Sequence, residues 1–483
     1  MSGPTLVVTD VEVGRRRGVG VRVVGGRIEA VGPDVRPRPG ERTLDGAGGA
    51  LVPGLHDHHV HVLALAARDR SVEVGPALAP GPDALGARLR DAAAHPGPDG
   101  WVRAVGYDDA VVGLLDRGRL DAWVPQVPVR VQDRTGASWV LNSAGLAVVL
   151  AGAGSLPPEV ERDERGAPTG RIWRGDTWLR SRLPATPPDL ASVGTSLAAR
   201  GVTALTDATV GTGPAEVAVL AAALAAGELP QRLWVMSGGP LEVPSQPRLR
   251  LGPVKVVLDD ARLPPLEEVA ERVRLAHRAG RAVAVHCVTL AELVVALAAF
   301  GDAGTQDGDR IEHAGVVPVA LVDRLRALRL TVVTQPAFVA DRGDAYLRHV
   351  DPRDQPDLYR CRSLLDAGVP VAASTDAPFG PSDPWAAVRA ARWRTTASGR
   401  LLGPDEAVGA RRALALFQGS ATRPGGRARR VVPGAPADLC LLRGRLAAVL
   451  DDVVAGGEPT VAATVVDGAV VALDDPGRLN LHG

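Results

Sequence analysis

Lys255 is the first residue of this chain whose type points to chemistry. It is the one lysine in 483 residues, so the remaining 54 of the 55 basic residues are arginines. An arginine stays protonated, whereas a lysine amine can lose its proton and react. We therefore expect Lys255 to perform amine chemistry that a guanidinium cannot perform. The alternative is an ordinary cation at the end of a strand.

A pair of histidines is the second chemical feature. His59 and His61 end the run Pro53-Gly-Leu-His-Asp-His-His-Val-His61. Residues two apart on an extended strand point the same way, so these two imidazoles can face one point. The same parity turns His56 and His58 away, and we expect neither to be a ligand. A polar strand end near solvent is the competing interpretation of the pair.

Three more residues with metal-ligating side chains close apolar runs further along the chain. His286 ends Ala-Val-Ala-Val-His, His313 ends Arg-Ile-Glu-His, and Asp376 ends Val-Ala-Ala-Ser-Thr-Asp. Taken singly, such residues are more often hydrogen-bonded histidines or turn caps. Together with Lys255 and the histidine pair, they predict a shared metal site at the carboxyl ends of parallel strands.

Alternating apolar and amphipathic segments indicate how these ends are positioned. Parallel βα units produce this pattern, and eight strands complete a closed (β/α)8 barrel. The expected strands are 50–55, 201–207, 231–237, 253–259, 281–287, 309–314, 330–335 and 369–375. We predict an α/β fold, in which a TIM-type barrel is joined by a small β-sandwich domain formed by the N- and C-terminal segments.

The domain boundaries follow from where the alternation of apolar and amphipathic segments begins, ends and is interrupted. Strand-like runs near both termini place residues 1–49 and 425–483 in the composite β domain, and residues 50–424 in the barrel. A Trp-, Pro- and Gly-rich stretch at about 66–190 interrupts the βα pattern after the first strand. We expect it to be a long insertion that folds over the barrel mouth. The Asp- and Arg-rich stretch 337–366 is predicted to be a long loop after the seventh strand, which either contacts substrate or is a solvated connection.

Composition excludes several classes of function. The formal net charge is zero, which gives no electrostatic footprint for nucleic acid or an anionic membrane. Three cysteines without a paired motif fit a reducing cytoplasm, and we see neither a signal peptide nor a membrane span. We expect a cytoplasmic protein that acts on a small molecule.

These residues resemble the motifs of the amidohydrolase superfamily, and within it those of the YtcJ-like metal-dependent hydrolases related to N-substituted formamide deformylase. The resemblance covers nearly the whole chain. It is carried by Pro53-Gly54, Asp57, His59-x-His61, Lys255, His286, Glu312-His313, Gln335-Pro336, Thr375-Asp376-Ala377-Pro378 and the tail Gly434-Ala-Pro-Ala-Asp438.

The resemblance implies two divalent metal ions, usually zinc. His59, His61 and Asp376 would hold one ion, His286 and His313 the other, and Lys255 would bridge both as its CO2-derived carbamate. A metal-activated hydroxide would then attack an amide, N-formyl or cyclic-amide carbon, with Asp376 moving the proton to the leaving nitrogen. The family also implies a homo-oligomer, either a dimer or a tetramer.

Weaker candidates surround this set. Asp57 and Glu312 could orient the ligating imidazoles, although a surface salt bridge is an equal alternative for Glu312. Relatives often carry a substrate-contacting histidine in the insertion, which this chain lacks between Asp133 and Asn142. Tyr107, Arg134 or Thr135 could take its place, and Asn142 is a further candidate for contact with substrate. Arg134 could equally be a structural ion-pair partner.

Two competing functions remain open. A deaminase of the same superfamily typically uses one metal ion and needs no bridging lysine. A catalytically inactive binding or scaffold relative would keep the barrel and lose its ligands. The presence of Lys255 disfavours the first, and the intact ligand set disfavours the second.

Overall fold

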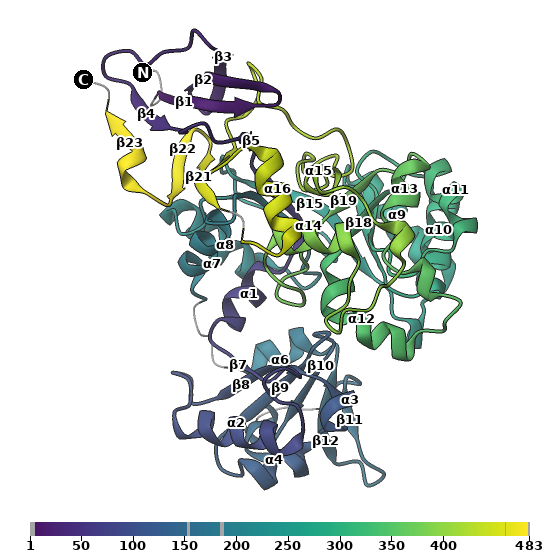
Figure 1. Ribbon diagram of the computed structural model, residues 1–483. Coiled ribbons are helices and arrows are strands. Elements are labelled where there is room, and N and C mark those ends of the chain that lie inside the picture. The colour runs from purple at the N-terminus through teal and green to yellow at the C-terminus, as the bar shows by residue number, and fades with distance from the viewer. Residues whose placement is uncertain (1–4, 152–154, 184–187, 459, 482–483) are drawn as a thin grey trace. The chain divides into compact units, whose positions relative to one another are not determined.

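The computed structural model describes residues 5–151, 155–183, 188–458 and 460–481. The chain divides into two compact units (Figure 1). One unit comprises residues 1–62 and 190–483, and the other comprises residues 63–189.

The first unit contains an eight-stranded parallel sheet that forms a nearly closed barrel. Its two end strands meet because Asp376 N donates to His59 O at 2.9 Å and His61 N donates to Ala377 O at 2.8 Å. The predicted (β/α)8 fold is thereby confirmed. In sheet order the strands are β6 (Leu55–Val60), β13 (Val202–Asp207), β14 (Arg232–Ser237), β15 (Leu249–Val257), β16 (Val283–Cys287), β17 (Arg310–His313), β18 (Thr331–Thr334) and β19 (Val371–Ala373).

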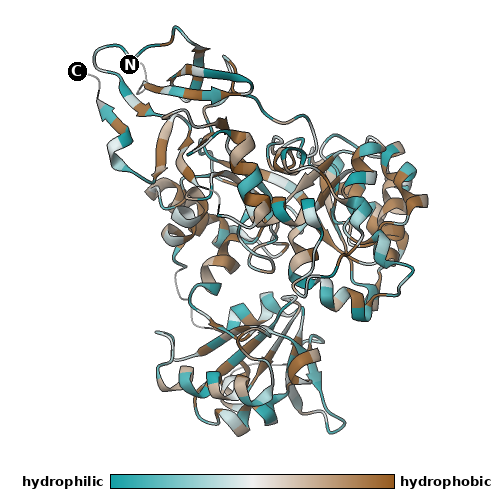
Figure 2. Ribbon diagram, in the orientation of Figure 1, coloured by the Kyte–Doolittle hydropathy of each residue, from teal (hydrophilic) through white to brown (hydrophobic). Residues whose placement is uncertain are grey.

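Helices that bury one apolar face surround this sheet, as the alternation of brown and teal in Figure 2 shows. In α9, for example, Val269, Ala270 and Val273 are buried, and Gly280 follows the helix with a φ of 70°. The stretch expected as a loop at 337–366 is largely helical, because Phe338 and Val339 give its first turns a buried face. The helices are α7 (Leu190–Ala198), α8 (Pro214–Ala226), α9 (Leu266–Arg278), α10 (Leu290–Ala303), α11 (Val319–Ala327), α12 (Ala337–His349), α13 (Arg362–Asp366), α14 (Pro384–Trp393) and α15 (Ala410–Ala415).

The first barrel strand lies further along the chain than the predicted range 50–55. Leu51–Pro53 form a separate strand, β5, which pairs with a C-terminal strand outside the barrel. The chain changes sheets at Gly54, where a Cβ atom would lie 2.1 Å from Thr203 Cγ2. Pro53-Gly54 is a turn signal inside the predicted strand, and it marks the break that the structure shows.

Strands from both ends of the chain build the remaining part of the first unit. A five-stranded sheet and a four-stranded sheet share one apolar core that includes Val8, Val21 and Leu441, so they pack as a small sandwich. Gly25-Gly26 and Asp467-Gly468 form the expected turns with positive φ values. The sheet orders are β23-β4-β1-β2-β3 and β22-β21-β20-β5, with β1 (Leu6–Val13), β2 (Arg16–Val24), β3 (Arg27–Gly32), β4 (Arg42–Asp45), β20 (Leu439–Leu442), β21 (Val461–Val466), β22 (Ala469–Leu473), β23 (Leu479–Leu481) and the helix α16 (Leu446–Ala455).

The second unit consists of the insertion, which has a six-stranded sheet of its own. Two apolar clusters cover opposite faces of that sheet, one with α2 and α4 and the other with α5 and α6. The strand order is β11-β12-β10-β9-β8-β7. The elements are β7 (Val72–Glu73), β8 (Val102–Tyr107), β9 (Val129–Asp133), β10 (Ser138–Leu141), β11 (Val160–Arg162), β12 (Pro168–Trp173), α2 (Pro82–Ala94), α3 (Asp109–Val112), α4 (Arg117–Trp123), α5 (Ser143–Leu150) and α6 (Asp176–Arg182), preceded by α1 (Val62–Arg68).

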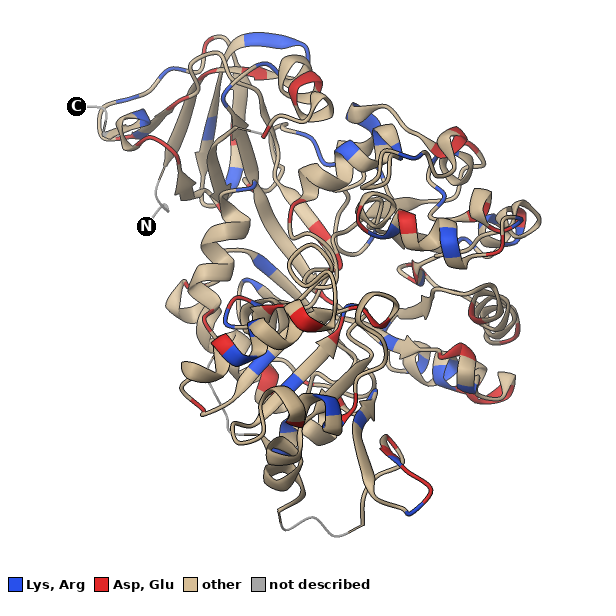
Figure 3. Cartoon of the chain, turned by 60° about the horizontal axis from the view of Figure 1, so that its bottom comes forward, with Lys and Arg blue, Asp and Glu red and all other residues tan. Residues whose placement is uncertain are grey.

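Acidic and basic residues are interspersed along the chain, as the red and blue segments of Figure 3 show. In the described part of the chain, no helix combines the length and the apolar character that crossing a membrane requires.

Asp438 links the terminal sheets to the barrel. Its buried carboxylate accepts from Arg232 Nε on β14 at 2.8 Å and from Asp467 N at 2.9 Å. Its backbone oxygen accepts from Gly54 N at 2.9 Å, at the point where the chain changes sheets. One residue therefore fixes the barrel, the C-terminal hairpin and the start of β6.

We predict that Asp438→Asn lowers stability by about 1–3 kcal/mol, because Arg232 loses its buried charged acceptor. Thermal and urea unfolding of the purified protein measure this loss. Asp323→Asn, at a carboxylate whose side chain is 81% exposed, is the matched control and should change stability little. Equal midpoints for the two variants would contradict the role given to Asp438.

Candidate metal centre

Three of the predicted ligands converge at the junction of β6 with the segment after β19. The ligand atoms of His59, His61 and Asp376 all lie within 4.8 Å of one another. Asp376 Oδ1 is 3.4 Å from His59 Nε2 and 3.2 Å from His61 Nε2. Asp376 has a φ of 55° and His313 a φ of 67°, so both backbones occupy the strained left-handed region. Such strain is characteristic of functional sites.

A buried ion-pair chain orients His59. Glu312 Oε2 bonds to His59 Nδ1, and Glu312 Oε1 lies 2.5 Å from Arg310 Nε. Arg310 and Glu312 are both almost fully buried, so the surface salt bridge considered for Glu312 is wrong. Because Glu312 engages Nδ1, His59 presents Nε2 to Asp376. Arg310 was not among the predicted site residues, although an arginine inside a predicted buried strand is a signal that could have identified it.

His61 and His313 are oriented in the same way by neutral partners. His61 Nδ1 bonds to Thr209 Oγ1 at 2.9 Å, and His313 Nδ1 bonds to Gln335 Oε1 at 2.9 Å. Gln335 Nε2 donates to Ser374 Oγ at 2.9 Å, which leaves the amide oxygen to accept from His313. Each imidazole therefore has its Nε2 directed away from its partner. Thr209 was not singled out from the sequence.

The strand register brings Lys255 and His286 to the same end of the barrel. Val257 pairs with His286, and Cys287 pairs with His313, so the ends of β15, β16 and β17 are level. The His286 ring lies 4.5 Å from the His313 ring, and the His313 ring lies 4.8 Å from that of His59. All the predicted ligands thus lie on neighbouring strand ends of one unit.

Lys255 is buried to 2% exposure, and its Nζ has no hydrogen-bond partner among the described residues. Burial lowers the pKa of this amine, and the charges of Glu312 and Asp376 oppose that shift only in part. A buried ammonium without an acceptor is costly, so the site favours a neutral or modified amine.

The carboxylates of the site differ in their electrostatic state. Burial by itself raises the pKa of Asp376, but the imidazoles of His59, His61 and His313 outweigh it and hold this pKa below its usual range. Burial raises the pKa of Asp57 to about 7. The oxygens of Asp57 accept from Thr375 N at 3.0 Å, from Thr375 Oγ1 and from His59 N at 3.3 Å. Asp57 therefore holds the backbone of the barrel junction, whereas we expected it to orient an imidazole.

The neighbouring histidines take no part in this cluster of ligand atoms. His56 Nε2 bonds to Thr206 Oγ1 at 2.8 Å, and its ring stacks on that of His58 at 4.1 Å. Both side chains are buried, as is Cys287 on β16.

The three candidates in the insertion have structural partners within the second unit. Tyr107 donates to Gly113 O at 2.7 Å, and Arg134 forms an ion pair with Asp108 at 2.7 Å. Asn142 is fully buried, and its side chain accepts from Val129 N at 2.9 Å and from Gly145 N at 2.8 Å. Their substrate contacts remain predictions.

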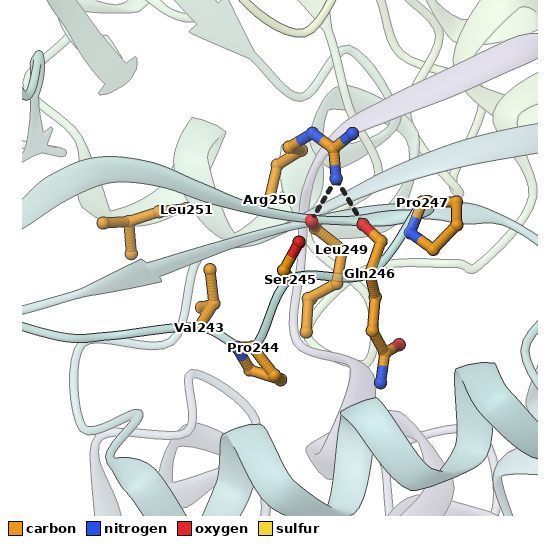
Figure 4. A pocket seen from close by; sticks show the side chains of 8 residues that line it. All are labelled: Val243, Pro244, Ser245, Gln246, Pro247, Leu249, Arg250 and Leu251. Atoms are coloured by element: carbon orange, nitrogen blue, oxygen red, sulfur yellow. Dashed lines mark hydrogen bonds between the residues drawn. The ribbon is translucent and has the colours of Figure 1, made fainter.

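The first unit has a surface hollow around the start of β15. It is lined by residues 243–247 and 249–251, and Arg250 there donates to the backbone oxygens of Gln246 and Leu249 (Figure 4). Lys255 belongs to the opposite, carboxyl end of the same strand. The hollow contains none of the predicted ligands.

The donor set fits a divalent metal ion. Imidazole nitrogens and a carboxylate are the ligands that zinc prefers, and their hydrogen-bonded Nδ1 atoms supply the usual outer partners. Asp376 Oδ1 and Lys255 Nζ are buried polar atoms that have no hydrogen-bond partner in the described chain. A cation would satisfy Asp376 Oδ1, and conversion of the Lys255 amine to a carbamate would make that side chain a metal ligand.

We predict that Glu312→Gln weakens metal binding by about 10- to 100-fold, because His59 loses the anion that fixes its ligating tautomer. Competition with a chromogenic chelator measures this affinity without an activity assay.

The matched control is Glu406→Gln, which removes the charge from another buried Glu–Arg pair, that of Glu406 with Arg360 at 2.5 Å. It should lower stability and leave metal affinity unchanged. A similar loss of metal in both variants would show that the effect of Glu312 is general destabilisation.

Comparisons with known proteins agree with this geometry. The family model described as "Amidohydrolase family" matches residues 42–472. N-substituted formamide deformylase of Arthrobacter pascens is 27% identical over 458 residues, covering 82% of this chain and 84% of that protein. The putative amidohydrolase YtcJ of Bacillus subtilis is 24% identical over 402 residues, covering 74% and 75% respectively.

A solved structure shares the fold. An uncharacterized metal-dependent hydrolase from Pyrococcus horikoshii superposes with a TM-score of 0.70 at 21% identity, covering 90% of this chain and 96% of that chain. The family match spans most of the sequence, including every predicted ligand. The chain therefore belongs to the amidohydrolase family of metal-dependent hydrolases.

Proposed function

We propose that this protein is a two-metal hydrolase that cleaves a carbon–nitrogen bond in a small amide, N-formyl compound or cyclic amide. The observation that carries the proposal is the buried amine of Lys255, which has no hydrogen-bond partner among the described residues and belongs to the same end of the barrel as the four histidines and Asp376. A catalytic site that needed only a positive charge at this position would be served by arginine, which the chain uses at every other basic position.

The lowered pKa of Lys255 supports its conversion to a carbamate. A neutral amine adds to CO2 with formation of an N–C bond and loss of one proton. The product carries one negative charge shared by two oxygens, so the modified Lys255 could contact two cations at once. In this assignment His59, His61 and Asp376 would hold one ion, and His286 and His313 would hold the other. Zinc is the ion that this donor set favours.

Divalent ions held there supply Lewis-acid polarisation of a carbonyl group and lower the pKa of a bound water. The side chains of this protein carry out the proton transfers and hold the ligands in position. Asp376 keeps its carboxylate ionised because three imidazoles surround it, so it can accept a proton from the attacking water. The protonated Asp376 then donates that proton to the leaving nitrogen, which departs as an amine. Glu312, Thr209 and Gln335 hold the imidazoles in place during the exchange.

The named relatives support the choice of bond. N-substituted formamide deformylase is, by its name, an enzyme that removes a formyl group from a substituted formamide. The same reaction type on a small amide is therefore the first to test. The substrate itself is chosen by loops that differ between relatives.

We predict that Lys255→Ala loses about one of two metal equivalents and most of the activity, because the bridging carboxylate is gone. Lys255→Arg should fail in the same way, since a guanidinium keeps the charge and cannot form the carbamate. Short carboxylic acids such as acetate should restore part of the activity of the alanine variant only. Metal content by plasma emission and hydrolysis of N-substituted formamides are the measurements.

Val256→Ala provides the matched control for these variants. Val256 is buried on the same strand and alternates with Lys255, so its truncation tests folding damage alone. Unchanged metal content and turnover in Lys255→Ala would refute the bridging role.

We further predict that the chelated protein, refilled with zinc in the presence of bicarbonate, binds about two equivalents and regains activity. Refilling without CO2 should give less metal. Fewer than about one equivalent would contradict the two-metal centre. One equivalent with release of ammonia from an amino-substituted ring would identify a deaminase. Full metal occupancy without hydrolysis across amides, formamides and cyclic amides would identify a binding relative.

A further inference from the structure

Two arginines of the insertion lie side by side on one face of its sheet. Arg103 on β8 and Arg130 on β9 are register partners in neighbouring parallel strands (Figure 1). Their neighbours Val102, Ala104 and Val129 belong to the apolar cluster on the opposite face, so both guanidinium groups project from the same side. Like charges on paired strand positions repel each other.

Neither guanidinium has a carboxylate within ion-pair distance among the described residues. No ion pair is recorded for Arg103 or Arg130 in the part of the chain that the structure describes, whereas Arg171 on the same sheet pairs with Glu161. Arg103 Nη1 donates to Ala67 O at 2.9 Å and to Ser71 Oγ. Arg130 Nε is buried and has no hydrogen-bond partner among the described residues.

Aromatic rings hold the two cations in place. Arg130 lies over the rings of Trp101 and Trp139 at 5.6 Å from each centroid, and Arg103 lies over Trp139 at 5.2 Å. Trp139 is fixed in turn, because its Nε1 donates to Asp176 Oδ1 at 2.9 Å. Cation–π contacts orient a guanidinium plane and leave its N–H donors free to bind an acceptor.

The electrostatics show that this arrangement is costly in the absence of an anion. Burial, together with the charge of Arg130, lowers the pKa of Arg103 to about 9, although Asp176 and Glu73 oppose this shift. Burial also lowers the pKa of Arg130, against a weaker effect of Asp99. Both residues are partly exposed.

We propose that Arg103 and Arg130, braced by Trp101 and Trp139, form a binding site for the carboxylate or phosphate group of a small molecule. The donors of two adjacent guanidinium groups match the oxygens of either group. The bound anion would supply the negative counter-charge that the two arginines lack. The site lies wholly within residues 63–189 and is independent of the proposed hydrolase reaction.

The test is titration of the full-length protein with acetate, with inorganic phosphate and with chloride at constant ionic strength. Tryptophan fluorescence and calorimetry report binding without any turnover. We expect acetate or phosphate to bind more tightly than chloride, and the tighter of the two identifies the ligand group. Arg130→Met should weaken that binding by more than about tenfold, because a charge-assisted hydrogen-bond donor is lost.

Arg171→Met is the matched control, because it removes the same charge from the same sheet at an arginine that has its own carboxylate. It should leave anion binding unchanged. Arg130→Lys keeps the charge without the paired donors of the guanidinium group and should bind the anion with intermediate affinity. This variant still tests the proposal if the methionine variant misfolds. The proposal is overturned by equal binding of all three anions, by wild-type binding in Arg130→Met, or by an equal loss in Arg171→Met.

Discussion

The closure of the barrel between β6 and the segment after β19 is the constraint on which the site depends. His59 and Asp376 are more than three hundred positions apart, and they become neighbours only because backbone bonds join the two end strands. Asp57 strengthens this junction by accepting from both the backbone and the hydroxyl of Thr375. The same bonds hold Asp376 in its left-handed conformation, beside the two imidazoles.

Burial gives the site its chemical character. Water is excluded from His59, Glu312, Arg310 and Lys255, so each polar group there must be satisfied by another or by a ligand. The imidazoles achieve this with Glu312, Thr209 and Gln335, which leaves one nitrogen of each ring directed inward. The Lys255 amine has no such partner among the described residues, which is why its modification is central to the proposed chemistry.

The sequence predicted the barrel because parallel strands are buried on both faces and therefore appear as short apolar runs. It also predicted that His59, His61 and Asp376 would lie together, because the carboxyl ends of such strands share one edge. Other features were not predicted. The break at Gly54 lies within one predicted strand, although Pro53-Gly54 is a turn signal. Arg310 and Thr209 act through partners that are distant in sequence, and only Arg310 carried a usable signal, as an arginine inside a predicted buried strand. The insertion follows neither periodicity clearly, so its six-stranded sheet was not foreseen.

The pairing of β5 with β20 and of β4 with β23 has a consequence for biosynthesis. β4 and β5 are translated several hundred residues before their partners. Their pairing therefore waits for a distant part of the chain, and such distant contacts form slowly. During translation β4 and β5 present unpaired edges, so this protein is one whose folding in the cell should benefit from chaperones that shield exposed strands.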